Sequence, residues 1–398
     1  MKNNCFSSAD ILLAKGDKQK WSVIACDQYT SEPEYWQKTK EIVGSEPSAL
    51  NIILPEVYLE QADDKCIDEI NDTMKKYLAN GVFEEHKDTM VYIERVQSDG
   101  KIRRGLLGKI DLTCYDYNKG TTASVRATEE TVLERIPPRV RIRRDAVLEM
   151  PHIMLLIDDP DGTVIEPLAK NEENLASLYN FELMQNGGKI EGRKLSETEK
   201  ATVDTALEAL YERCNGLLFC VGDGNHSLAT AKACYELNPN EKSRYALVEV
   251  VNIHDEALQF EPIYRAVFGV NPEELIEKVI EDCGGIYEGD DAQKFTCIYG
   301  DNRREFSLKG SAKLCVGTLQ ASLDRLLKGT DAVIDYIHGE ESLEKICKAP
   351  NTVGFLFKGM EKSELFPAVL NDGSLPRKTF SMGHADDKRF YLEARVIK

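Results

Sequence analysis

Apolar residues follow two patterns along this chain: short continuous runs, and spacing at every third or fourth position. Runs with the length and character of buried strands lie at residues 151–157, 217–221, 245–251 and 352–357. Residues 63–78 instead place their apolar side chains at helical spacing and are followed by Asn80-Gly81, which predicts an amphipathic helix. Together the two patterns predict a mixed α/β protein.

The remaining segments extend this assignment. Further helices are expected to begin at Ser31-Glu32-Pro33-Glu34 and to occupy residues 172–188, 198–214, 272–283, 319–327 and 341–348. Further strands are expected at residues 21–26 and 51–55, and in two hairpins, 90–96 with 102–110 and 294–299 with 304–308. On the first hairpin, Gly105 and Gly108 indicate the close approach of another backbone or of a ligand.

Two glycine-containing segments leave alternatives open. Asp158-Asp159-Pro160-Asp161-Gly162 has the oxygen groups of a divalent-cation site, although a turn is the simpler interpretation. Asn186-Gly187-Gly188 is either a hinge for a segment that closes over a site or a plain turn.

The stretch over residues 216–237 combines an apolar strand, a glycine turn and a helix. The turn, Gly222-Asp223-Gly224-Asn225-His226, is built from residues that tolerate left-handed backbone, and Ser227 is expected to cap a helix over residues 228–237. This arrangement directs backbone N–H groups and a helix dipole at an anion, although it matches neither a Walker A loop nor a dinucleotide fingerprint. The alternative is a tight turn whose polar side chains bond local backbone.

A second feature is basic. Residues 135–144 contain five arginines and no acid. If this segment is extended, Arg139, Arg141 and Arg143 lie on one face, and their guanidinium groups suit phosphate or carboxylate oxygens. We favour such an anion pocket over the alternative, a basic surface paired with the nearby acids Glu129, Glu130, Glu134, Asp145 and Glu149.

Length and charge limit the possible classes of protein. The 398 residues exceed one ordinary core, and a boundary near residues 252–269 suggests domains over 1–251 and 252–398. The formal net charge of −18 argues against a nucleic-acid or acidic-membrane partner, so any anion must be drawn by a local basic pocket. The chain has no run of apolar residues long enough to span a membrane and no apolar signal core, so we expect a cytoplasmic protein.

The eleven cysteines are scattered, and none forms Cys-x-x-Cys. Their spacing argues against a zinc site or a disulfide framework, and the six dispersed histidines argue against a His/Cys metal site. We therefore expect reduced thiols in a reducing compartment.

The residues of the central stretch resemble those of a known family. Val221-Gly-Asp-Gly-Asn-His-Ser-Leu-Ala-Thr-Ala231 resembles the Asp-Gly-His-His-Arg box of a large uncharacterised family of bacterial and archaeal proteins of about this length. Asn225, His226 and Ser227 stand where the family has His-His-Arg. Other shared landmarks are the strand ending at Asp27, residues 126–129, the strand ending at Asp158-Asp159, and Pro376-Arg377-Lys378.

The same box is similar to motifs of the ParB/sulfiredoxin-like nucleotide-binding fold, some members of which are kinases of free serine. The resemblance implies a ParB/sulfiredoxin-like core over residues 1–251, a further α+β domain, and bound ATP or ADP with Mg²⁺. It suggests a nucleotide-dependent phosphotransferase that acts on a small polar metabolite such as an amino acid.

Each candidate residue has a role in this hypothesis. Asp27, or less strongly Glu129, is expected to accept the proton of the substrate hydroxyl, with His226 as a further catalytic candidate. The expected nucleotide ligands are Asp223, Gly224, Asn225, His226, Ser227, Arg126, Arg139, Arg141, Arg143 and Lys378. The alternative is a nucleotide sensor that binds without catalysis, which the altered box favours. The sequence leaves the oligomeric state open.

Overall fold

The computed structural model describes residues 5–30, 32–130 and 136–398. These residues form two compact units. Unit 1 comprises Met1–Ala127, Thr131–Leu258 and Gly383–Lys398, and unit 2 comprises Thr128–Glu130 and Gln259–Met382. The division differs from the expected domains 1–251 and 252–398 chiefly at the C-terminus, because residues 383–398 belong to the first unit.

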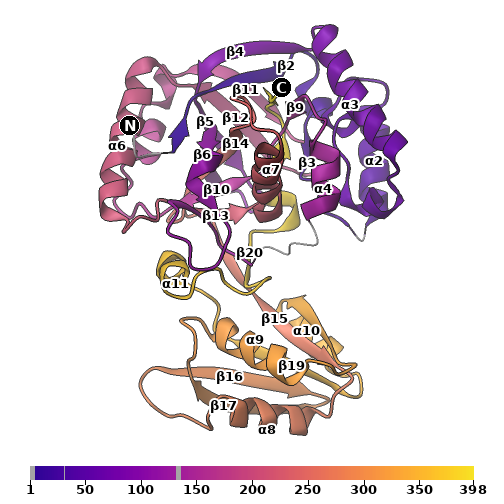
Figure 1. The fold of residues 1–398 in the computed structure, drawn as a ribbon, viewed down its shortest axis with the longest axis vertical. Coiled ribbons are helices and arrows are strands. Elements are labelled where there is room, and N and C mark those ends of the chain that lie inside the picture. Colours follow the sequence, from indigo (N-terminus) through magenta and orange to yellow (C-terminus); the bar gives the residue numbers. More distant parts are fainter. Residues whose placement is uncertain (1–4, 31, 131–135) are drawn as a thin grey trace. The chain divides into compact units, whose positions relative to one another are not determined.

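Unit 1 is organised around a large mixed sheet (Figure 1). Its strands are β1 (Phe6–Ser7), β5 (Val91–Val96), β6 (Ile102–Asp111), β7 (Tyr115–Asp116), β8 (Val125–Ala127), β10 (Met154–Ile157), β11 (Ala176–Glu182), β12 (Lys189–Lys194), β13 (Phe219–Asp223) and β14 (Tyr245–Asn252). Among the described residues their order is β11-β12-β5-β6-β14-β10-β13-β8-β7, and β1 pairs with β6. The β10–β14, β8–β13 and β7–β8 pairs are parallel and the others antiparallel.

Three short strand pairs are the other strands found among the described residues of unit 1. They are β2 (Ala9–Ala14) with β4 (Phe83–Thr89), β3 (Val23–Ile24) with β21 (Phe390–Tyr391), and β9 (Leu148–Glu149) with β22 (Arg395–Val396). Two of these pairs join the C-terminal end of the chain to strands near residues 23 and 148. The C-terminal segment, yellow in Figure 1, therefore lies among the early strands of unit 1.

The helices of unit 1 differ in length, and some of them begin at side-chain caps. They are α1 (Lys18–Trp21), α2 (Pro33–Val43), α3 (Asp64–Ala79), α4 (Ile136–Arg143), α5 (Glu166–Lys170), α6 (Glu197–Arg213) and α7 (Asn225–Leu237), with the 3-10 turns η1 (Ala49–Asn51), η2 (Glu56–Gln61), η3 (Leu112–Cys114), η5 (Glu172–Asn174) and η7 (Ala385–Asp387). Ser196 and Glu199 form a reciprocal capping box at the start of α6, and the Asp63 carboxylate accepts the Cys66 N–H at the start of α3.

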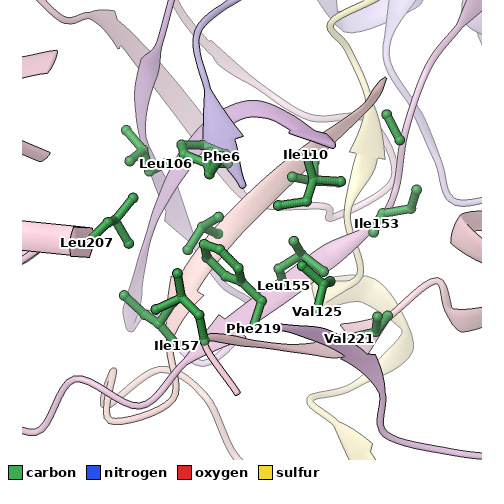
Figure 2. Packing of buried hydrophobic residues seen from close by; sticks show 14 of the residues in the cluster. Phe6, Leu106, Ile110, Val125, Ile153, Leu155, Ile157, Leu207, Phe219 and Val221 are labelled. Atoms are coloured by element: carbon green, nitrogen blue, oxygen red, sulfur yellow. The ribbon is translucent and has the colours of Figure 1, made fainter. Parts of the chain in front are cut away.

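The main sheet separates two hydrophobic cores. Successive residues of a strand face opposite sides, so Leu106 belongs to one core and Leu107 to the other. Figure 2 shows the first core, where Phe219 and Leu155 of adjacent strands lie with Leu207 of α6. Burial on both faces explains why β10, β13 and β14 are continuous apolar runs rather than alternating ones.

Unit 2 is a sheet with helices packed on it. Its elements are β15 (Phe260–Phe268), α8 (Pro272–Asp282), β16 (Ala292–Tyr299), β17 (Asn302–Lys309), α9 (Cys315–Leu326), β18 (Val333–His338), α10 (Glu340–Ile346), β19 (Thr352–Phe357), η6 (Lys362–Glu364), α11 (Leu365–Asp372) and β20 (Phe380–Met382). The described strands run β17-β16-β19-β15-β18, with β20 beside β15, and all of these pairs are antiparallel. Both units mix helices and strands, which confirms the predicted fold class.

Two predicted elements are wrong. Residues 172–188 form β11 and a turn rather than a helix, because Gln185 and Asn186 adopt positive φ and the chain reverses into β12. The Asn186-Gly187-Gly188 segment is the turn of this hairpin. Residues 51–55 form no strand, because Ser48 caps a 3-10 turn there and Pro55 has no N–H for a strand ladder.

One expectation about the thiols is also wrong, since Cys5 and Cys114 form a disulfide. Strand β1 pairs with the end of β6 and the Asp111 N–H donates to the Cys5 carbonyl, which brings the two Cα atoms to 6.3 Å. The two cysteines are 109 positions apart, so their pairing has no local sequence signal. The other nine cysteines are free.

The close approaches expected at Gly105 and Gly108 are confirmed. A β-carbon at Gly105 would lie 2.4 Å from a carboxylate oxygen of Glu249, and one at Gly108 would lie 2.6 Å from the Ser7 carbonyl oxygen. Both glycines sit where a neighbouring strand brings a second chain segment against β6.

Replacing Gly105 by Ala is expected to lower the free energy of unfolding by about 1–3 kcal/mol, because the new methyl group displaces the buried Glu249 carboxylate. Urea unfolding of the two proteins measures the difference. The matched control is Gly16→Ala, where nothing lies within 4 Å, and it is expected to leave stability unchanged or higher. Equal effects of the two substitutions would contradict the crowding at Gly105.

Candidate functional site

Polar side chains from four separate segments of unit 1 meet at one place. Asp27 follows β3, His152 precedes β10, Asp223 and Ser227 flank the turn between β13 and α7, and the C-terminal segment contributes two more. We call this set the site cluster: Asp27, His152, Asp223, Ser227, Lys388 and Tyr391. The structure thus brings Asp27 and the central glycine turn together.

The central turn has a backbone that favours glycine. Gly224 has φ +81° and is the N-cap of α7, and a β-carbon there would lie 3.0 Å from the Ile153 Cα. The Gly224 N–H donates to the Asp223 carboxylate at 2.8 Å. The helix therefore begins before Ser227, and the expected capping role of Ser227 is wrong: its hydroxyl turns to His152 instead.

His152 is the centre of the site cluster. Its Nδ1 atom lies 2.7 Å from the Tyr391 hydroxyl, and its Nε2 atom lies 3.3 Å from Ser227 Oγ and 3.9 Å from Asp27 Oδ2. The serine and the aspartate face the same ring nitrogen, whereas a Ser-His-Asp triad has them on opposite nitrogens. The ring is buried and held by Tyr391, so it presents a fixed Nε2 atom to Ser227 and Asp27.

Asp27 is a carboxylate held in its ionised form. Burial opposes its ionisation, but the electrostatic effect of His152, a hydrogen bond from Gln28 at 3.0 Å and the charge of Lys388 together lower its pKa below the ordinary value. Its side chain is 32% exposed, so a ligand can reach it. An ionised, accessible carboxylate beside an imidazole can accept a proton.

Lys388 supplies a cation to the site cluster. Its Nζ atom lies 3.2 Å from Asp223 Oδ2, and its side chain is only 15% exposed. Together with the left-handed turn and the start of α7, this ammonium gives the site the groups that bind anionic oxygens.

Cys26 lies next to Asp27 but is unsuited to nucleophilic chemistry. Burial, and then the Asp27 charge, raise the pKa of its thiol to about 12. The Tyr391 hydroxyl donates to Cys26 Sγ at 3.1 Å. A thiol with so high a pKa stays protonated at neutral pH, so Cys26 acts as packing rather than as a reactive group.

The arginine-rich segment differs from its prediction. Residues 136–143 form α4, which packs against α7, so the three arginines do not share one face of a strand. The alternating pattern suggested a strand, but Pro137 and Pro138 lie in the first turn of a helix, where proline is tolerated.

Each of these arginines has a carboxylate partner. Arg139 pairs with Glu56, Arg141 with Asp64 and Arg143 with Glu149. Arg139 lies near enough to Cys26 to oppose the rise of its thiol pKa, whereas Arg143 does the same for Cys234, near the other end of α7. Of the three, Arg139 thus acts electrostatically on Cys26, the residue before Asp27.

The remaining predicted residues are not members of the site cluster. Asn225 and His226 are in the first turn of α7, and Arg126 on β8 donates to the Ala123 carbonyl at 2.8 Å. Glu129 and Lys378 belong to unit 2, where Glu129 bridges to Leu375 and accepts the Thr379 N–H at 3.4 Å. Residues 158–162 form a turn in which the Gly162 N–H donates to the Asp159 carbonyl. This is the simpler of the two interpretations of that segment.

Sequence reasoning missed three members of the site cluster: His152, Lys388 and Tyr391. The one available sequence signal for His152 is that it lies just before a buried strand, whereas Asp27 lies just after one. Lys388 and Tyr391 lie in the C-terminal segment, whose pairing with β3 spans more than 360 positions.

The fold and the site cluster describe a mixed α/β protein with a carboxylate, an imidazole and an ammonium around a glycine turn. A comparison with known families matches residues 11–326 to the family described as "Protein of unknown function (DUF1015)". Because the match covers most of the chain, the protein belongs to this family, which confirms the predicted membership of an uncharacterised family.

Several solved structures are similar to the chain. A conserved hypothetical protein from Pyrococcus furiosus has 13% identity and a TM-score of 0.39, over 71% of this chain and 95% of that chain. Free serine kinase in complex with AMP has 12% identity and a TM-score of 0.41, over 71% and 92%. SbnI with a C-terminal truncation, from Staphylococcus aureus, has 13% identity and a TM-score of 0.37, over 67% of this chain and 82% of that chain. No curated protein matches the chain.

Two further properties bear on partners. No described helix has both the length and the apolar character needed to cross a bilayer. In the described part of the chain, no three His, Cys, Asp or Glu side chains are grouped as ligands of a metal ion.

The lowered pKa of Asp27 predicts a pH-dependent contribution to stability. Its pKa is lower in the folded protein than in the unfolded chain, so the ionised carboxylate stabilises the fold above the ordinary pKa, and that stabilisation is lost as pH falls toward the folded value. The free energy of unfolding of wild type minus that of Asp27→Asn is therefore expected to be larger at about pH 5 than at about pH 3. A difference independent of pH would contradict the contacts described for Asp27.

Proposed function

We propose that this protein binds a nucleotide at the turn before α7 and transfers its terminal phosphoryl group to the hydroxyl of a small polar metabolite, such as an amino acid. The supporting observation is the meeting of Asp27, His152 and Lys388 at the left-handed Gly224 turn. An anion site and a proton acceptor in one place are what such a transfer requires.

The groups have distinct roles in this proposal. The phosphate oxygens accept hydrogen bonds from the start of α7 and from Lys388, which exchanges its partner Asp223 for phosphate. The acceptor oxygen attacks the terminal phosphorus, the bond from that phosphorus to the bridging oxygen breaks, and the nucleoside diphosphate leaves. Asp27 takes the proton of the attacking hydroxyl, and His152 holds Asp27 ionised.

A magnesium ion fits this site only as a companion of the nucleotide. Mg²⁺ keeps several waters and is commonly held by one or two carboxylates together with substrate phosphates. Asp223, beside the proposed phosphate position, is the carboxylate that would hold it. Bound there, the ion supplies charge neutralisation for the phosphates.

Replacing Lys388 by Met is expected to weaken the affinity for ADP in the presence of Mg²⁺ by tenfold or more, about 1.4 kcal/mol, because a phosphate-binding cation is lost. Isothermal titration measures Kd for both proteins. The matched control is Lys101→Met, an exposed lysine in the turn of the β5–β6 hairpin, which is expected to bind like wild type. If the Lys388→Met protein binds ADP with unchanged affinity, the proposal that the phosphates bind at this turn is wrong.

A second candidate is a nucleotide sensor that binds without turnover. The observation that favours it is the pairing of Arg139, Arg141 and Arg143 with carboxylates, since none of the three is then poised to neutralise charge that develops during transfer. The resemblance to the Asp-Gly-His-His-Arg box, in which Ser227 stands in the place of the arginine, favours the same candidate.

Asp27→Asn separates the two candidates. For a phosphotransferase, the loss of the proton acceptor is expected to lower kcat by about 10²–10⁴-fold while nucleotide affinity is kept. Phosphoryl transfer from labelled ATP to a panel of amino acids and other small hydroxyl compounds provides the measurement, with Asp68→Asn on the exposed face of α3 as control. A wild-type protein that binds nucleotide but transfers nothing to any acceptor would favour the sensor.

A further inference from the structure

The C-terminal site segment, residues 386–391, connects every part of the site cluster. It carries Lys388, which reaches Asp223, and Tyr391, which reaches His152. It also pairs with β3, and the Ala25 N–H donates to the Arg389 carbonyl at 3.0 Å, two positions before Asp27. The geometry of the site therefore depends on how this segment is held.

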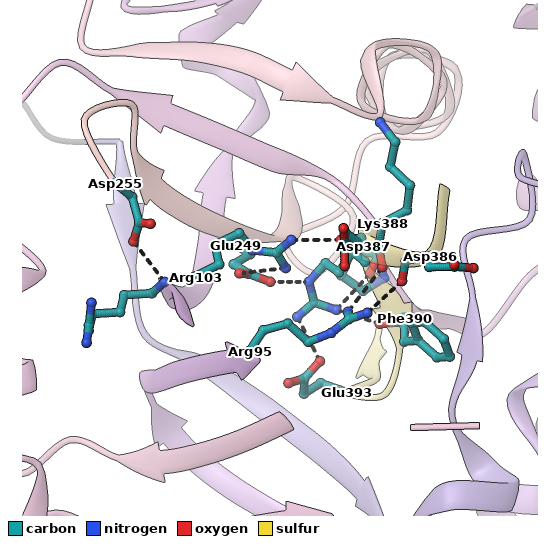
Figure 3. Close-up of polar contacts among 12 residues, drawn as sticks. Arg95, Arg103, Glu249, Asp255, Asp386, Asp387, Lys388, Phe390 and Glu393 are labelled. Carbon is teal, nitrogen blue, oxygen red and sulfur yellow. Dashed lines mark hydrogen bonds and ion pairs between the residues drawn. The ribbon is translucent and has the colours of Figure 1, made fainter. Parts of the chain in front are cut away.

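The β5–β6 hairpin holds the segment by three consecutive carbonyl oxygens. Arg95 donates to the carbonyls of Asp386 at 2.9 Å and Lys388 at 3.1 Å, and Arg103 donates to the Asp387 carbonyl at 3.0 Å. The turn of the same hairpin adds Ser98, whose N–H and hydroxyl both donate to the Asp387 carboxylate. Figure 3 shows both arginines directed at residues 386–388.

This arrangement of buried arginines lowers the stability of the fold, so a contribution to stability does not account for it. Arg95 and Arg103 are directly opposite each other on antiparallel strands, where like charges repel. Arg95 is fully buried, and its terminal nitrogens donate to carbonyls rather than to carboxylates. Burial and then the Arg103 charge lower the Arg95 pKa to about 9, which shows that its charge is disfavoured there.

Carboxylates and an aromatic ring offset the cost. The Glu249 carboxylate, in the space that Gly105 leaves, lies between Arg103 at 3.5 Å and Arg389 at 2.7 Å. The Arg95 guanidinium lies over the Phe390 ring at 5.0 Å. Arg389 also donates to the Pro151 carbonyl at 3.2 Å, directly before His152. The same buried network thus holds the backbone at Lys388 and at His152.

We propose that Arg95 is a positioning residue for the site: by holding the carbonyls of Asp386 and Lys388, it fixes the direction in which the Lys388 ammonium leaves the backbone toward Asp223. Its importance for ligand binding rests on the proposed function, which makes Lys388 the phosphate-binding cation. The position of Lys388 itself is measurable without any nucleotide.

The test is the acetylation rate of individual lysines, followed by peptide mass spectrometry on the full chain. In wild type, Lys388 is mostly buried and paired, so it reacts slowly. In Arg95→Met, which keeps the side-chain length, the Lys388 rate is expected to rise about tenfold or more, because the hydrogen bonds from a charged group to both carbonyls are lost. Arg95→Lys, which can donate to only one of the two carbonyls, is expected to give an intermediate Lys388 rate. It replaces Arg95→Met in the test if that variant fails to fold.

Two controls separate positioning from general loosening. Lys200 is also mostly buried and paired, with Asp88 and Glu197, so its rate should stay at the wild-type value in both variants. Arg104→Met removes the next arginine of β6, on the opposite face, and should leave Lys388 unchanged. An unchanged Lys388 rate in a folded Arg95 variant, or an equal rise at Lys200, would overturn the proposal.

The same variants distinguish this proposal from the proposed function. If wild type binds ADP and Arg95→Met binds it more weakly together with the faster labelling of Lys388, both proposals hold. If wild type binds no nucleotide but the acetylation rate of Lys388 alone rises in Arg95→Met, the positioning role of Arg95 stands and the nucleotide assignment fails. If nucleotide binds and Lys388 stays protected, the positioning role fails alone.

Discussion

The buried charges between the β5–β6 hairpin and residues 386–391 are the constraint on which the site depends. A guanidinium in a low-dielectric core must find acceptors, and Arg95 finds them in the carbonyls of the C-terminal site segment. These hydrogen bonds hold the backbone of the segment in place, and the segment in turn sets the positions of Lys388 and Tyr391. Buried ion networks contribute little net stability, so a role in specifying one arrangement of the chain is the better account of this one.

An acidic chain gains from a site built in this way. A net charge of −18 repels anions from most of the surface, so attraction has to be local and short-ranged. In the proposed function, the left-handed turn at Gly224 and the start of α7 provide backbone groups for this attraction, and Lys388 provides the charge. Asp27 and His152 stand beside the same turn, which places a proton acceptor where an anionic ligand would be held.

Local sequence patterns predicted what depends on neighbouring residues. The β5–β6 hairpin with its crowded Gly105, the helices α3 and α6, and the strand, turn and helix around Gly224 are confirmed. Distant pairings were missed: Arg95 and Lys388 are 293 positions apart, and no periodicity connects them. Among the segments whose predicted structure is wrong, α4 and β11 are two where proline placement or a turn with positive φ outweighed the apparent periodicity.

The most direct test of a nucleotide-phosphate site at this cluster is affinity labelling with an acyl phosphate derivative of ATP, which transfers its acyl group to a lysine beside the bound phosphates. The account predicts that Lys388 acquires the group and that excess ADP with Mg²⁺ prevents it. Labelling confined to other lysines, or labelling of Lys388 that excess ADP does not reduce, would contradict the account.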